Sequence, residues 1–173
     1  HMGNYLNPGF DGFVKTINSE IYIDKTGLIL YTNRVMNTQQ GYLCVSRPRR
    51  FGKSMAADML AAYYSCGEDS SELFDGLQIS RSESYRKNLN QYDVIKVNMQ
   101  DFLSMTHSMD EMLEMLQRYL IRELTRSFEA VDFFDRTNLI QMLKDIYAET
   151  DRAFVILIDE WDCLFREYQH DQV

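Results

Sequence analysis

The chain has 173 residues, 45% of them hydrophobic and 25% charged, and this composition excludes intrinsic disorder because it supplies enough apolar surface for a globular core. Lys and Arg number 18 against 26 Asp and Glu, which gives a formal net charge of -8. Such a balance excludes a domain that coats nucleic acid or an anionic membrane with its whole surface. Any basic binding site must therefore be local.

The cysteines and the hydropathy pattern indicate in which cellular compartment the protein is expected. Cys44, Cys66 and Cys163 are scattered and form no CxxC pair, which argues against a disulfide framework and a zinc site and favours a reducing, cytoplasmic location. The sequence shows no apolar run of about 18 residues and no signal peptide. We therefore expect no membrane partner.

The first part of the chain predicts a leader that packs on a core. We interpret residues 1–3 as an expression scar, 4–40 as the leader and 41–173 as the core. Residues 5–13 combine turn residues with aromatic ones. Asp24-Lys25-Thr26 is expected to form a turn that fixes the leader, with contact to a nucleotide as the alternative.

Strands and helices alternate through the core. Each predicted strand is an unbroken apolar run, which is typical of a parallel sheet covered on both faces, and the fold class is therefore α/β. The predicted elements are, in chain order, a strand at 41–46, a helix from Met55 to near Gly67, a strand at 93–98, a helix that opens at the capping box Ser108 to Glu111, a helix at 139–147 and a strand at 154–158.

The helix after Ser108 has a strong apolar periodicity. Its methionines are expected to belong to the core, with an adaptable partner surface as the alternative. The residues predicted on its buried face are Met109, Met112, Leu113, Leu116, Leu120, Leu124 and Phe128.

Gly52-Lys53-Ser54 lies between a predicted strand and a predicted helix, which is the context of a phosphate-binding loop. Unpaired backbone N–H groups at a helix N-terminus attract phosphate oxygens, and Gly52 permits close approach. Lys53 would contact the β- and γ-phosphates, and the Ser54 hydroxyl would bind Mg2+. The alternative is a chance tripeptide in a solvated basic loop.

Arg47 stands where the general phosphate-loop template has glycine, so the match to that template is degenerate. Arg47, Arg49 and Arg50 nevertheless concentrate positive charge in an acidic chain, which favours an anion site. The residues expected to contact the nucleotide are Arg47, Pro48, Arg49, Arg50, Phe51, Gly52, Lys53, Ser54 and Met55.

The apolar run at 154–158 ends in Asp159-Glu160. In a phosphate-loop enzyme Asp159 would orient the metal ion, and Glu160 would act as general base on the attacking water, so that Glu160 and Lys53 are the candidate catalytic residues. The alternative is that the two acids begin the next helix, where they would favour its dipole. Asn98, Gln100 and Asp101 follow the neighbouring strand and are weaker candidates for contact with substrate or water.

Five segments resemble the bacterial AAA-ATPase-like family, in which an N-terminal phosphate-loop domain precedes a restriction-endonuclease-like nuclease domain. That family tolerates a residue other than glycine at the start of the loop. The segments are Asn7-Pro-Gly-Phe-Asp-Gly-Phe13, Tyr22-Ile-Asp-Lys-Thr26, Ser46-Arg-Pro-Arg-Arg-Phe-Gly-Lys-Ser54, Leu73-Phe-Asp-Gly-Leu77 and Ile156-Leu-Ile-Asp-Glu-Trp-Asp162.

The resemblance implies a P-loop NTPase three-layer sandwich that binds ATP and Mg2+ and hydrolyses ATP in the full-length protein. It also implies homo-oligomers with an arginine finger from a neighbouring subunit, and contact with nucleic acid only through the C-terminal domain. The alternative is a nucleotide-switched binding or scaffold module with little hydrolysis.

In that class a further strand, which would follow Val173, lies between the phosphate-loop strand and the Asp159 strand. We therefore expect a core truncated after the Walker B strand, with weak or absent activity by itself. The sheet would be completed by a non-standard element, by a neighbouring chain, or by direct pairing of 42–46 with 154–158.

Overall fold

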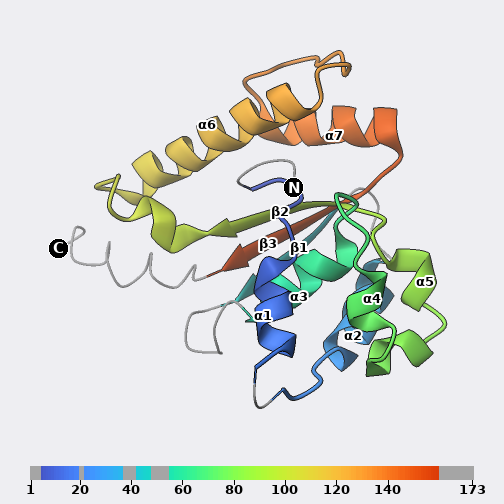
Figure 1. Cartoon of the computed structure of the whole chain (residues 1–173). Coiled ribbons are helices and arrows are strands. Elements are labelled where there is room, and N and C mark those ends of the chain that lie inside the picture. The colour runs from blue at the N-terminus through green and yellow to red at the C-terminus, as the bar shows by residue number, and fades with distance from the viewer. Residues whose placement is uncertain (1–4, 20–21, 37–41, 48–54, 160–173) are drawn as a thin grey trace.

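The computed structural model describes residues 5–19, 22–36, 42–47 and 55–159 (Figure 1). Three strands form a central sheet, and helices lie on both of its faces. The elements are α1 (Asp11–Ile17), α2 (Gly27–Met36), β1 (Tyr42–Arg47), α3 (Met55–Tyr64), α4 (Ser71–Phe74), η1 (Gln78–Arg81), α5 (Tyr85–Asn88), β2 (Asp93–Asn98), η2 (Met99–Phe102), α6 (Met109–Ser127), α7 (Leu139–Thr150) and β3 (Phe154–Asp159).

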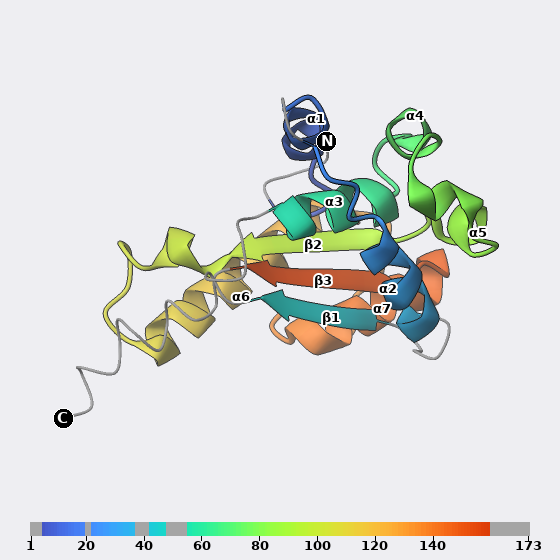
Figure 2. The same cartoon turned by 90° about the horizontal axis from the view of Figure 1, so that it is seen from below.

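The three strands form one parallel sheet in the order β1-β3-β2 (Figure 2). Tyr42 of β1 is in register with Phe154 of β3, and Asp93 of β2 is in register with the same residue from the other side. Strand β1 therefore pairs directly with β3. This is one of the three arrangements expected from the sequence, and the pairing confirms it.

Helices cover both faces of this sheet. Alternate residues of each strand point to opposite faces, so a strand of apolar residues needs a cover on both. Val155 and Leu157 pack with helices α1, α2 and α3, whereas Phe154 packs with α6 and α7. Figure 1 shows α6 and α7 on one side of the sheet and α1 to α5 on the other. The predicted α/β class is confirmed at this level, and the complete P-loop sandwich stays a prediction.

Helix α6 begins at the predicted cap. The Ser108 hydroxyl accepts a hydrogen bond from the Glu111 backbone N–H at 3.1 Å, and the Glu111 carboxylate accepts one from the His107 backbone N–H at 3.1 Å. Met112 is buried as expected, but Leu113 is 41% exposed. The prediction for Leu113 was wrong, because the buried stripe of α6 is narrower than its apolar stripe.

The leader covers the free edge of β2. Leu6 forms an antiparallel bridge with Ile95, and the Lys96 backbone N–H donates to the Tyr5 carbonyl oxygen at 2.9 Å. The Glu123 carboxylate on α6 accepts hydrogen bonds from the backbone N–H groups of Tyr5 and Leu6. The edge strand thus gains partners for its backbone groups, which an open edge would leave exposed.

A second part of the leader is fixed by the predicted turn. The Asp24 carboxylate accepts from the Thr26 backbone N–H at 2.9 Å and from the Gln78 backbone N–H at 2.8 Å. The Thr26 hydroxyl, on a fully buried residue, accepts from the Ile79 backbone N–H at 3.2 Å. These bonds join the start of α2 to η1, as the structural interpretation of this turn requires.

Asn7 connects the leader to the start of β2. Its backbone has φ of 45°, in the left-handed region that asparagine tolerates better than most residues, and its side chain is buried. The Nδ2 group donates to the Asp93 carboxylate at 3.1 Å, and the Oδ1 atom accepts from the Val94 backbone N–H at 2.7 Å. Arg152 forms an ion pair with the other Asp93 oxygen at 3.4 Å.

We predict that Asn7→Ala lowers the free energy of unfolding by about 2–3 kcal/mol, because it leaves a buried amide N–H and a buried carboxylate without these hydrogen bonds. Urea unfolding followed by circular dichroism measures the change. Asn18→Ala, at an exposed position, is the matched control and is expected to change stability by less than about 0.5 kcal/mol. Equal effects of the two substitutions would contradict the role of Asn7.

Among the described residues, no helix is both long enough and apolar enough to cross a membrane.

Candidate functional site

The carboxyl ends of the three strands meet at one edge of the sheet. The Cα atoms of Arg47, Asp159 and Asn98 are in register across β1, β3 and β2. Ligands of open α/β sheets bind beyond this edge. The structure therefore brings the start of the predicted phosphate loop next to the predicted metal-binding acid.

Helix α3 begins at the same edge. Its first turn lies beside the carboxyl half of β2, because Asp58 forms an ion pair with Lys96. Just after its last turn, Ser65 forms a β-bridge with Tyr92, the residue before β2. The helix thus runs antiparallel to the strands. Its N-terminus, at Met55, lies at the carboxyl edge of the sheet, where backbone N–H groups favour an anion.

Asp159 lies on the sheet face that α3 covers. It follows Val155 and Leu157 with the alternation of a strand, and both of these residues pack with α3. The side chain is 4% exposed. A buried carboxylate beside a helix N-terminus suits a metal–phosphate complex, because both the metal and the helix end are electropositive.

The other predicted site residues are described in part or not at all. For Arg47 and Met55 the structure gives the backbone only, as the end of β1 and the start of α3. Residues 48–54, which include Gly52, Lys53 and Ser54, and residues 160–173, which include Glu160, lie outside the described residues. Their roles stay predictions.

Asn98 is placed beside Asp159 with a defined orientation. Its Oδ1 atom accepts a hydrogen bond from the Gln100 backbone N–H at 2.9 Å and so caps η2. The Nδ2 group donates no hydrogen bond within the described part of the chain, and it is therefore a donor held at the carboxyl edge. Gln100 and Asp101, the other two weaker candidates, are exposed.

An ion pair near the site was missed at the sequence level. The Asp58 carboxylate lies 2.9 Å from the Lys96 ammonium group, and each side chain is 24% exposed. The pair joins the first turn of α3 to β2. The available signal was a lysine between apolar residues of the predicted strand at 93–98. Only the fold identifies Asp58 as its partner.

Helix α1 packs on this first turn of α3 at Gly12. A Cβ atom at Gly12 would lie 2.6 Å from the Asp58 Oδ2 atom and 2.7 Å from its Cγ atom. Only a residue without a side chain permits this approach while Asp58 keeps its contact with Lys96. The leader is thereby coupled to the helix that begins at the predicted loop.

We predict that Gly12→Ala lowers the free energy of unfolding by about 1–2 kcal/mol, although alanine favours a helix over glycine by about 1 kcal/mol. The cause is the displacement of Asp58 from Lys96. Gly27→Ala is the control, because the Gly27 Cβ position has its nearest neighbour at 3.9 Å, an ordinary contact. Thermal melts measure both variants, and Gly27→Ala is expected to raise the melting temperature slightly. An equal rise for Gly12→Ala would refute the close packing.

The described residues contain no group of three or more His, Cys, Asp or Glu side chains that could hold a metal by themselves. Mg2+ in nucleotide sites is held by one or two protein oxygens together with phosphate oxygens and water. Asp159, as one buried carboxylate at the sheet edge, fits this kind of site.

Comparison with known proteins decides the family. The sequence profile of a family described as predicted AAA-ATPase, or AAA-ATPase-like, matches residues 8–172. The chain belongs to this family. The family implies nucleotide binding, and the carboxyl edge of the sheet, with Asp159 and the start of α3, is where such a ligand is expected in this AAA-ATPase-like chain.

One curated relative is an uncharacterized protein in the vnfD 5' region of Azotobacter chroococcum mcd 1. It is 26% identical over 146 residues, which cover 82% of this chain and 25% of the relative. The chain thus spans about a quarter of the length of this relative. No solved structure matches the chain.

Proposed function

We propose that the chain is the Mg-ATP-binding region of an AAA-type ATPase and that it hydrolyses ATP as part of the full-length protein. One observation carries the proposal: the buried Asp159 at the end of β3 is in register with the end of β1, from which the chain leads into Gly52-Lys53-Ser54 and then α3. An acid and a phosphate loop on adjacent parallel strands are the two parts that nucleotide hydrolysis requires.

Each proposed group has one physical role. The backbone N–H groups of residues 49–55 surround the phosphates, and Lys53 places a positive charge against the β- and γ-phosphates. Ser54 and Asp159 hold the metal ion, directly or through its water. Glu160 takes a proton from the water that attacks the γ-phosphate.

When bound, Mg2+ supplies positive charge that offsets the charge on the transferring phosphoryl group. The protein's part is to fix the oxygens around it. The burial of Asp159 excludes competing water from one side of the site and so strengthens its attraction to a cation.

Asn98 is proposed to orient the attacking water or the γ-phosphate. The hydrogen bond from Gln100 fixes its Oδ1 atom, so the Nδ2 group is the part of the side chain that remains for a ligand. Its position next to Asp159 on the neighbouring strand supports this role.

Lys53→Ala is expected to weaken ATP binding at least about a hundredfold, because the substitution removes the only proposed ammonium group on the phosphates. Isothermal titration calorimetry with Mg-ATP measures the affinity. Lys87→Ala, an exposed lysine on α5, removes the same charge elsewhere and should leave the affinity unchanged. Equal affinity of the Lys53→Ala variant and the unsubstituted chain would refute the phosphate site.

Glu160→Gln is expected to keep ATP binding and to reduce phosphate release by the full-length protein about a hundredfold or more, because the amide cannot accept the proton. Phosphate release and calorimetric affinity are measured on the same preparation. Retained hydrolysis would remove Glu160 from the role of base. Binding without hydrolysis in the unsubstituted full-length protein would instead favour a nucleotide-switched binding module.

Other properties of the whole protein are proposals that rest on the family resemblance. They are assembly into homo-oligomers with an arginine finger supplied between subunits, and contact with nucleic acid through a C-terminal nuclease-like domain. The acidic net charge of this chain supports the view that such contact belongs to another part of the protein.

A further inference from the structure

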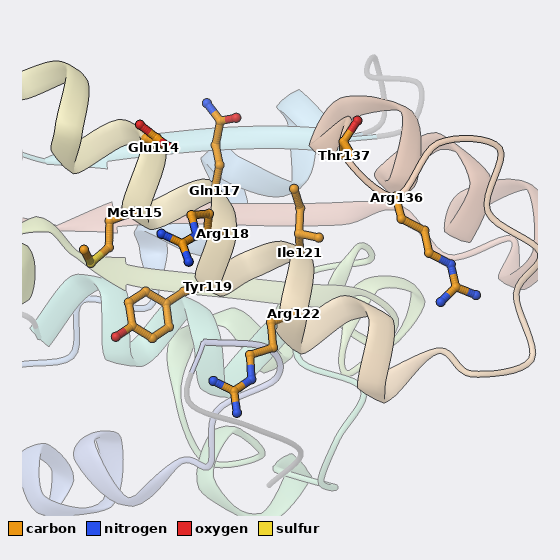
Figure 3. Close-up of a pocket in the computed structure, with 9 residues that line it drawn as sticks. All are labelled: Glu114, Met115, Gln117, Arg118, Tyr119, Ile121, Arg122, Arg136 and Thr137. Carbon is orange, nitrogen blue, oxygen red and sulfur yellow. The ribbon is translucent and has the colours of Figure 1, made fainter.

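A groove of about 650 Å3 lies along α6. Its lining side chains come from α6 and from the loop before α7 (Figure 3). We call it the α6 groove. Its lining residues are Glu114, Met115, Gln117, Arg118, Tyr119, Ile121, Arg122, Arg136 and Thr137.

The charge of the α6 groove is opposite to that of the chain. Its lining holds three arginines and one acid, Glu114, whereas the whole chain has 26 acidic and 18 basic residues. Arg118, Arg122 and Arg136 are all exposed. Within the described residues none of the three forms an ion pair, and the Arg136 guanidinium group lies over the Phe133 ring at 5.8 Å.

Three acids of the same layer, Glu123, Asp135 and Asp145, bind groups other than these arginines. Glu123 accepts hydrogen bonds from the backbone N–H groups of Tyr5 and Leu6. Asp135 accepts from the backbone N–H and the hydroxyl of Thr137, which holds its pKa below the ordinary value.

Asp145, on α7, is occupied in the same way. It accepts from the Phe134 backbone N–H and from the Gln141 side-chain amide, each at 2.9 Å. The fold thus uses its own carboxylates to fix the leader and the loop before α7. The guanidinium groups in the groove remain without carboxylate partners inside the described chain.

Apolar side chains lie among and around the arginines. Met115, Tyr119 and Ile121 line the groove, and Tyr119 is 38% exposed. Phe134, in the loop before α7, is 87% exposed, and Leu113 on α6 is 41% exposed. Arginine, tyrosine and methionine beside aliphatic residues are the composition of the centre of protein–protein interfaces.

We propose that the α6 groove binds an acidic protein segment that also carries apolar side chains. The three arginines would take carboxylates, to which a planar guanidinium group binds in a bidentate way. Met115, Tyr119 and Ile121 would contact the apolar side chains. A nucleic acid is disfavoured because three of the nine lining residues are apolar and the chain as a whole is acidic.

The spacing of the arginines favours a helical segment. Arg118 and Arg122 are four residues apart on α6, which places them about 6 Å apart along the helix axis. Carboxylates at i and i+4 of a partner helix have the same spacing. Arg136 comes from the loop before α7, also lines the groove, and would bind a third carboxylate (Figure 3).

The proposal is tested by fluorescence anisotropy with a labelled helix-forming peptide of about 18 residues, which has glutamates at i and i+4 on one side and leucines on the other. The chain is expected to bind this peptide. A control peptide in which glutamine replaces each glutamate is expected to bind at least about tenfold more weakly. The double substitution Arg118→Gln and Arg122→Gln should weaken binding of the glutamate peptide by a similar factor. Arg136→Gln should weaken it as well.

The matched control is the double substitution Arg34→Gln and Arg86→Gln, which removes the same charge at exposed positions on α2 and α5, outside the groove, and should change the affinity by less than about twofold. Equal loss in both double variants, absence of binding to the glutamate peptide, or tighter binding of a single-stranded DNA of similar length would each overturn the proposal. Mg-ATP affinity, measured in parallel, should be unchanged by all of these substitutions. The outcome is therefore separate from that of the proposed nucleotide site.

Discussion

The position of β3 between β1 and β2 is the constraint on which the rest of the structure depends. Parallel pairing on both sides aligns three carboxyl ends at one edge, and the register brings Asp159 level with Arg47 and Asn98. Strand β3 is apolar up to Asp159, its last residue, because its side chains pack on both faces of the sheet. The same pairing therefore forms the core and positions the acid of the candidate site.

The leader stabilises this sheet along the edge of β2 and also through the packing of α1 on α3. Asn7 and Glu123 fix the leader along β2, where hydrogen bonds replace solvent at the strand edge. Gly12 lets α1 approach α3 closely enough to contact Asp58, which in turn pairs with Lys96. The contacts of the leader thus extend to the first turn of the helix that follows the predicted phosphate loop.

The distribution of charge follows from what each carboxylate binds. In the α6 and α7 layer Glu123, Asp135 and Asp145 accept hydrogen bonds from N–H groups of the protein and stabilise its loops. Arginines four residues apart on α6 repel rather than pair with one another, and their long side chains extend into solvent. An acidic chain can in this way present a basic groove, although its net charge alone predicts no such surface.

The sequence by itself determined the α/β class, the strands at 93–98 and 154–158 and the cap at Ser108, because strand and helix periodicity and capping are local properties of the chain. It also named Asp159 as the candidate metal-binding acid, and this role stays a prediction. Only the tertiary structure decided the strand order, the partners of Asn7, the pairing of Asp58 with Lys96 and the exposure of Leu113. These depend on contacts between residues far apart in the chain, and such contacts are set by how the layers pack rather than by the pattern of any one segment.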